Sequence, residues 1–120
     1  MKSYHELGGK TRPVLFGFGA AYIFEQQTGK NALQMIDAFA KGEGNISDIV
    51  SMIFAGLLNG AEDDGLEVDF TAADVARWLS KAPTLVPVLL EQFAESFSAG
   101  AGDEGGEQKK RSPRGRPRRL

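Results

Sequence analysis

Apolar residues recur at intervals of three and four along the middle of the chain, which is the spacing of one buried face on an α-helix. The longest such series predicts a central helix that begins near Ile46. Its apolar members are Ile46, Ile49, Val50, Ile53, Phe54, Leu57 and Leu58. Asn59 and Gly60 follow at once, and because both residue types commonly end helices, the helix is expected to stop there.

Two shorter helices are predicted before the central one. The first contains Ala20, Ile23 and Phe24 and ends at Thr28-Gly29, because glycine readily adopts the left-handed conformation that closes a helix. The second follows Asn31, whose side chain can cap a helix, and stops before Gly42. Its apolar positions are Ala32, Met35, Ile36, Phe39 and Ala40.

A fourth helix is predicted to begin near Ala72. Thr71 and Asp74 have the spacing of a capping box, and Phe70 can pack on Val75 across the start of the helix. Its buried positions are expected to be Val75, Trp78 and Leu79.

Pro83 disfavours helix at the residue before it, so the fourth helix should break there and a fifth should begin nearby. Pro87 is tolerated only in the first turn of that fifth helix, where backbone N–H groups lack partners in any case. The apolar stripe of this helix consists of Val86, Leu89, Leu90, Phe93 and Phe97.

The first residues predict a β-hairpin instead. Two short stretches, 4–7 and 11–16, are joined by Gly8-Gly9-Lys10, and glycines supply the positive φ angles that tight hairpin turns need. Pro13 places the second stretch on a sheet edge. The sequence therefore predicts a mainly α fold, a small bundle of about five helices with an N-terminal β-hairpin.

Charge divides the chain into two parts. Residues 1–108 contain seven Lys and Arg against sixteen Asp and Glu, a net charge of −9, whereas residues 109–120 carry seven Lys and Arg and no carboxylate side chain, a charge of +7. We therefore expect a helical docking domain over residues 1–98 and a disordered tail over residues 99–120, first acidic and then basic.

Residues for catalysis are scarce. The chain has no cysteine and one histidine, His5, so neither a thiolate site nor a Ser-His-Asp triad is expected. The carboxylates of residues 62–69 do not fit the EF-hand spacing and predict a solvated acidic loop. Gly17-Phe18-Gly19 lacks the third glycine of a dinucleotide-binding turn. We therefore expect no enzyme activity, no cofactor and no metal, and we expect most aromatic side chains in the core.

No apolar stretch approaches the ~20 residues that span a bilayer, and the N-terminus lacks an apolar secretory core. No membrane contact is expected. The protein is expected to be soluble and cytoplasmic.

The linear arrangement resembles the tail assembly chaperones of tailed phages. The resemblance runs from Leu7-Gly8-Gly9-Lys10 through Val14-Leu15-Phe16-Gly17 and the Glu25-to-Gly29 helix end to the stretch Ile53-Phe54-Ala55-Gly56-Leu57, and covers roughly residues 7–90. It implies a small helical protein in the cytoplasm of a bacterial host that coats the tape-measure protein and recruits tail-tube subunits. Self-association along the client fits that role.

The same resemblance implies two further features. Members of the family are also made in a longer, frameshifted form, so this chain would be the short product, with slippery codons near Lys109-Lys110. Contacts with the client would come from exposed apolar helix faces, and the candidates are Leu57, Leu58, Val86, Leu90 and Phe93, each of which could instead complete the core.

A second hypothesis comes from the basic tail. Pro113-Arg114-Gly115-Arg116-Pro117 resembles the core of an AT-hook, in which glycine lets the backbone enter a narrow A·T minor groove and the arginines lie along its floor. Arg114, Gly115 and Arg116 would then bind DNA. Three alternatives remain. The tail could bind polyanions without sequence preference, or it could dock on the chain's own acidic surface, and the protein could be a structural adaptor or head-to-tail connector retained in the particle.

Overall fold

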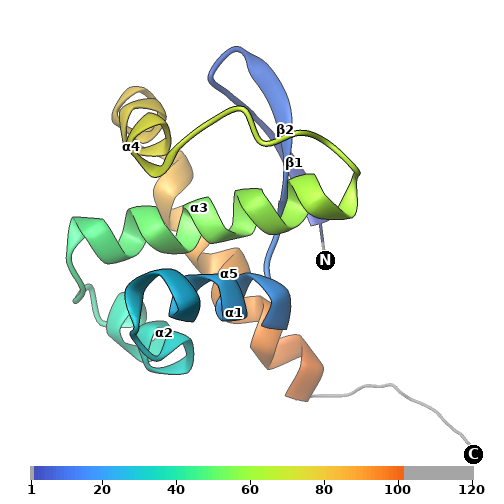
Figure 1. Cartoon of the computed structure of the whole chain (residues 1–120). Coiled ribbons are helices and arrows are strands. Elements are labelled where there is room, and N and C mark those ends of the chain that lie inside the picture. The colour runs from blue at the N-terminus through green and yellow to red at the C-terminus, as the bar shows by residue number, and fades with distance from the viewer. Residues whose placement is uncertain (1, 102–120) are drawn as a thin grey trace, which may run out of the picture.

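The computed structural model describes residues 2–101, and the side chains of residues 2–97 (Figure 1). The elements are β1 (Lys2–Leu7), β2 (Lys10–Leu15), α1 (Phe18–Thr28), α2 (Ala32–Ala40), α3 (Ile46–Asp63), α4 (Ala72–Lys81) and α5 (Leu85–Ala101). The predicted fold class is confirmed, with five helices and an N-terminal antiparallel hairpin. The expected boundary at residue 98 falls within α5, and the predicted disordered tail beyond residue 101 lies outside the described residues.

Helix α3 lies at the centre of the molecule. In Figure 1 α1 and α2 lie on one side of it, the hairpin and α4 lie on the other, and α5 crosses behind it. Its fully buried residues Met52, Ile53 and Leu57 belong to one cluster with residues of every other helix and of the hairpin. The fully buried partners are Val14, Phe24, Val75, Leu89 and Phe93. One core therefore surrounds α3, as expected for a chain of this size.

The predicted end of α3 at Asn59-Gly60 is wrong, since the helix continues through both residues to Asp63. The Asn59 side-chain amide donates a hydrogen bond of 3.0 Å to the carbonyl oxygen of Leu15 at the end of β2. A Cβ atom on Gly60 would lie only 2.7 Å from the Pro13 carbonyl carbon. Both residues thus bring the hairpin onto α3, and the tertiary contact overrides their preference for helix ends.

The hairpin turn consists of Gly8 and Gly9, with φ angles of 62° and 82°. Lys10, expected in the turn, instead pairs with Leu7 as the first residue of β2. A Cβ atom on Gly8 would meet the Trp78 ring of α4, with its Nε1 at 2.7 Å. The tip of the hairpin therefore rests on α4, and only glycine fits between them.

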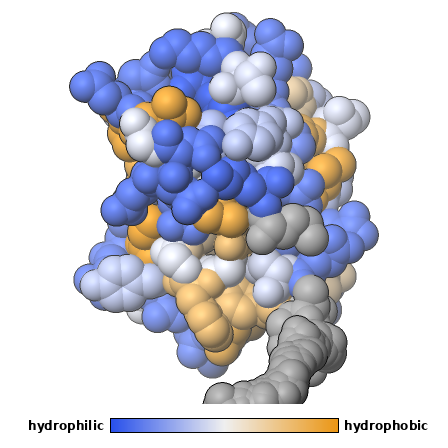
Figure 2. All heavy atoms as spheres, turned by 90° about the vertical axis from the view of Figure 1, so that its right-hand side faces the viewer, coloured by the Kyte–Doolittle hydropathy of each residue, from blue (hydrophilic) through white to orange (hydrophobic). Residues whose placement is uncertain are grey.

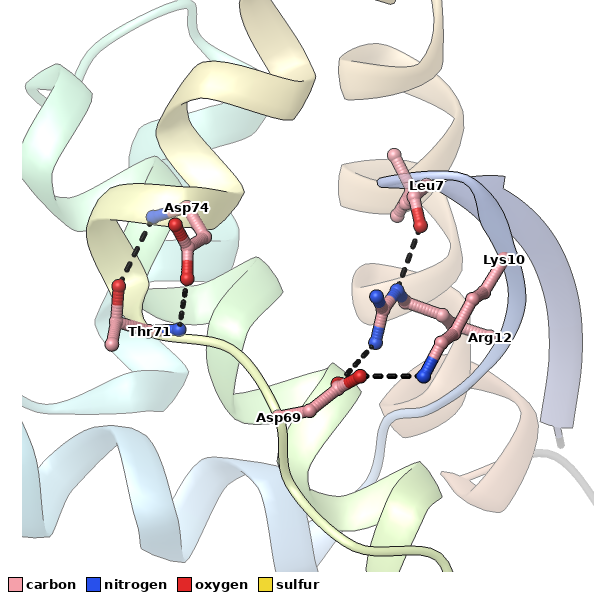
Figure 3. Close-up of polar contacts among 6 residues, drawn as sticks. All are labelled: Leu7, Lys10, Arg12, Asp69, Thr71 and Asp74. Carbon is pink, nitrogen blue, oxygen red and sulfur yellow. Dashed lines mark hydrogen bonds and ion pairs between the residues drawn. The ribbon is translucent and has the colours of Figure 1, made fainter.

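The predicted capping box of α4 is confirmed (Figure 3). The Thr71 hydroxyl accepts a hydrogen bond of 3.2 Å from the Asp74 N–H, and the Asp74 carboxylate accepts one of 2.9 Å from the Thr71 N–H. The predicted cap of α2 is present as well, because the Asn31 side chain accepts a hydrogen bond from the Gln34 N–H.

Candidate docking surface

Three large apolar side chains on α1 and α2 face the solvent. Phe18 is 80 % exposed, Tyr22 65 % and Leu33 55 %. Phe18 and Tyr22 are four residues apart and therefore share one face of α1. Together with Phe97 of α5 these side chains line a hollow of about 340 Å³, and the rings of Phe18 and Phe97 pack edge to face with their centroids 5.5 Å apart.

A second hollow lies between α2 and α5. Its volume is about 410 Å³, and nearly all of its lining is apolar. Helix α2 contributes Ile36, Phe39 and Ala40, and α5 contributes Pro87, Leu90, Glu91, Phe93 and Ala94. Glu91 is the one charged residue of this lining.

The two hollows follow one boundary between helices. The end of α2 and the beginning of α5 line the larger hollow, whereas the beginning of α2 and Phe97 near the other end of α5 line the smaller one. Helices α2 and α5 therefore run antiparallel along this boundary. We call the two hollows and their lining the α2–α5 seam.

Figure 2 views the molecule from the right of Figure 1. Apolar side chains gather in the lower part of that face, whereas hydrophilic side chains cover most of the upper part. Monomeric proteins rarely leave large contiguous apolar patches in water, so an exposed apolar surface of this kind indicates a binding site.

The charges at the seam all have the same sign. Among the described residues, α1 carries only Glu25, α2 only Asp37 and α5 only Glu91 and Glu95, and none of the three helices has a Lys or Arg. Glu25 lines the smaller hollow and also accepts a hydrogen bond of 2.9 Å from the Ala32 N–H at the start of α2.

The lysines nearest to the seam in sequence are Lys30 and Lys41, which flank α2. Each is held in an ion pair, Lys30 with Asp48 at 2.8 Å and Lys41 with Asp37 at 3.0 Å. The seam thus combines apolar hollows with carboxylates, and its nearest cations are already paired.

The five residues that the sequence suggests as client contacts differ in how far the structure buries them. Leu57 and Phe93 are only 1 % and 0 % exposed, so they belong to the core, although Phe93 also forms part of the floor of the larger hollow. Leu58 and Val86 are half-buried and pack against the core. Leu90 is half-buried and lines the larger hollow. Only Leu90 has the position of a surface contact at the seam.

Sequence reasoning missed the exposed residues Phe18, Tyr22 and Leu33. Most aromatic side chains were expected in the core, and Leu33 is not among the apolar positions predicted for its helix. The spacing of Phe18 and Tyr22 could have revealed them, since it defines a face of α1 different from that of the buried residues Ala20 and Phe24. Arg114, Gly115 and Arg116 lie outside the described residues.

A second cluster of side chains joins the hairpin to α4 (Figure 3). Arg12 is only 8 % exposed. Its Nε donates a hydrogen bond of 2.7 Å to the Leu7 carbonyl oxygen, and its Nη1 donates one of 2.7 Å to the Asp69 carboxylate. Its guanidinium carbon lies 4.4 Å from the centre of the Trp78 ring and 5.2 Å from that of Phe70. Trp78 was predicted to be buried but is only half-buried, and its ring covers the Arg12 guanidinium.

Hydrogen bonds from Lys10 and Arg12 lower the pKa of Asp69 to about 2. Lys2 forms ion pairs with Asp63 and Asp64. Residues 62–69 are all exposed, as expected of a solvated acidic segment. Three of their carboxylates, Asp63, Asp64 and Asp69, also hold the loop and the end of α3 against the hairpin. The sequence could not show this, because the paired residues lie far apart along the chain.

The described residues show little that suggests catalysis. His5 is half-buried on β1, its ring Nε2 lies 2.9 Å from the Ser3 hydroxyl, and burial lowers its pKa. In the described part of the chain, no group of three His, Cys, Asp or Glu is placed to hold a metal ion. None of the helices there has the length and the apolar character needed to cross a membrane.

None of the protein-family models, curated proteins and solved structures compared with the chain matches it. The resemblance to tail assembly chaperones therefore stays a prediction from the sequence.

Proposed function

We propose that this protein is a non-enzymatic assembly chaperone of a phage or prophage tail, which binds the tape-measure protein and helps to recruit tail-tube subunits. The observation that carries the proposal is the α2–α5 seam. Helices commonly bind by placing an apolar stripe into such a groove. A tape-measure protein is a long helical client and offers such stripes along its length.

The proposal also fits the chemistry of the surface. Assembly chaperones release their client, so their contacts are reversible and need exposed apolar area instead of catalytic groups. Phe18, Tyr22 and Leu33 supply such area, and the core below them is complete without their side chains. Self-association of the chaperone along the client is part of the proposal.

The test is co-expression of the full chain with the product of the long helical reading frame expected downstream of its gene, followed by affinity capture. We expect the wild-type chain to capture this product and the Leu90→Glu variant to lose it, because a carboxylate would enter the apolar hollow. Leu66→Glu is the matched control, since Leu66 is 52 % exposed in the loop before α4 and does not line the seam.

Two outcomes would contradict the proposal. The first is failure of the wild-type chain to capture the product. The second is that the chain captures the product only when residues 109–120 are present, or that this segment binds A·T-rich duplex while the chain does not bind the product. That result would favour the minor-groove hypothesis and its residues Arg114, Gly115 and Arg116.

A further inference from the structure

We infer that the α2–α5 seam binds an amphipathic helix whose apolar stripe is flanked by lysine or arginine. This inference rests on the proposed function and names the chemistry of the client segment.

The arrangement of the hollows suits a helix. Leu90 lines the larger hollow and Phe97 the smaller one, and these residues are seven positions apart on α5. At 1.5 Å per residue, the separation along the axis of α5 is roughly 10 Å. Side chains seven residues apart on a client helix have the same separation and share one face. A client helix lying along α5 would therefore present one apolar side chain to each hollow.

The carboxylates around the hollows favour positive charges beside the apolar stripe of the client helix. Glu91 lines the larger hollow, Glu25 lines the smaller one, and Glu95 follows Glu91 by one turn on α5. Because α1, α2 and α5 carry no Lys or Arg in the described chain, no cation on these three helices offsets these carboxylates, and a partner with lysine or arginine would complement them. An acidic client would be repelled, so the same carboxylates reject wrong partners.

The other possible occupants fit less well. In a symmetric dimer of this chain through the seam, each copy would present the same acidic surface, and carboxylates would face carboxylates. The chain's own segment 109–120 has the right charge, but Leu120 is its only large apolar residue, so it cannot fill two hollows. A basic amphipathic helix supplies both the apolar residues and the positive charge.

The experiment uses two synthetic helical peptides with the same leucine stripe at heptad spacing, one flanked by lysines and the other by glutamates. Each is labelled and titrated with the full chain, and binding is followed by fluorescence anisotropy at low and high salt. We expect the lysine peptide to bind about ten-fold more tightly than the glutamate peptide at low salt, and the difference to shrink as salt rises.

Substitutions at the α2–α5 seam test whether the peptides bind there. The Glu91→Gln/Glu95→Gln variant should lower the affinity for the lysine peptide by roughly five-fold, since two ion pairs at an exposed interface are lost. The matched control Glu62→Gln/Glu67→Gln removes two exposed carboxylates that do not line the seam and should have no effect. Tyr22→Ser and Leu90→Ser should weaken both peptides, and Tyr22 is exposed enough that its loss spares the core.

Equal affinity for the two peptides, no binding of either, or full binding by Tyr22→Ser and Leu90→Ser would each overturn the inference. Capture of the natural client without binding of either peptide would leave the proposed function standing and remove only the inference. Binding of the lysine peptide without capture of the client would support this surface and contradict the tail-assembly role.

Discussion

The guanidinium carbon of Arg12 lies 4.4 Å from the centre of the Trp78 ring, so a buried cation from the hairpin is stacked on the only indole of the chain. The same guanidinium bonds to the Leu7 carbonyl and to Asp69. One side chain therefore joins the hairpin, the loop before α4 and α4 itself. The stability of this corner of the fold should therefore depend on Arg12.

Arg12→Ala should lower the free energy of unfolding by about 2 kcal/mol, because it removes the stacking and leaves the Leu7 carbonyl without its donor. Arg12→Lys should recover only part of this loss, since an ammonium group lacks the planar fork. Urea unfolding followed by circular dichroism measures both. Arg77→Ala, which removes an exposed ion pair with Asp74, is the control and should cost less. An equal loss in Arg77→Ala and Arg12→Ala would contradict the role of Arg12.

Asp69 should make stability depend on pH in the acid range. Lys10 and Arg12 lower its pKa from 3.8 to about 2 in the folded state, so its contribution is complete only above about pH 5. As the pH falls from about 5 to about 2 the folded state resists protonation while the unfolded state takes up the proton, and the contribution is lost. The stability difference between wild type and Asp69→Asn should therefore shrink across this range. A difference that stays constant from pH 7 to pH 2 would show that Asp69 does not titrate in this way.

Local signals in the sequence predicted the elements well. The capping box of Thr71 and Asp74 and the Gly8-Gly9 turn each depend on residues close together in the chain, and both are present. The burial of Arg12 was not predicted, because its partner Asp69 is 57 residues away. For the same reason the sequence predicts a helix end at Asn59, whereas its side-chain amide bonds to the carbonyl oxygen of Leu15 within α3's contact with the hairpin.

The sequence predicts that apolar helix faces are exposed, but it does not show which ones. Periodicity finds apolar stripes, but it does not show which stripe a neighbouring helix covers when a helix has more than one. Helix α1 is such a case, since it buries Ala20 and Phe24 and exposes Phe18 and Tyr22. The seam itself arises from the antiparallel placement of α2 and α5, which the sequence does not encode locally.

Gly60→Ala should destabilise the protein by about 2 kcal/mol, although alanine normally improves a helix interior by about 1 kcal/mol. The added methyl group would lie 2.7 Å from the Pro13 carbonyl carbon, and neither backbone can move without separating the hairpin from α3. Thermal unfolding measures the change. A more stable Gly60→Ala protein would contradict the close contact.

Thr71→Ala should lower the free energy of unfolding by about 1 kcal/mol, since the Asp74 N–H loses its acceptor at the start of α4. Ser80→Ala is a matched control in the same helix. The Ser80 hydroxyl bonds only to the Ala76 carbonyl oxygen, a contact that adds little to helix stability. Urea midpoints of the two variants give the comparison, and equal midpoints would mean that the capping box does not stabilise α4.

Leu90 and Phe93 lie one turn apart on α5, and their alanine variants should behave differently. Phe93 is fully buried, with its ring packed edge to face against Phe16, Phe39 and Phe97, so Phe93→Ala should cost about 3–5 kcal/mol. Leu90 lines an open hollow, so Leu90→Ala should cost about 1 kcal/mol or less. Under the proposed function the client would complete the contacts of Leu90, so client binding should weaken. Thermal unfolding and affinity capture of the same two variants separate stability from binding. If Leu90→Ala lost stability as Phe93→Ala does, the hollow would be part of the core, and α5 would have no free face for a client.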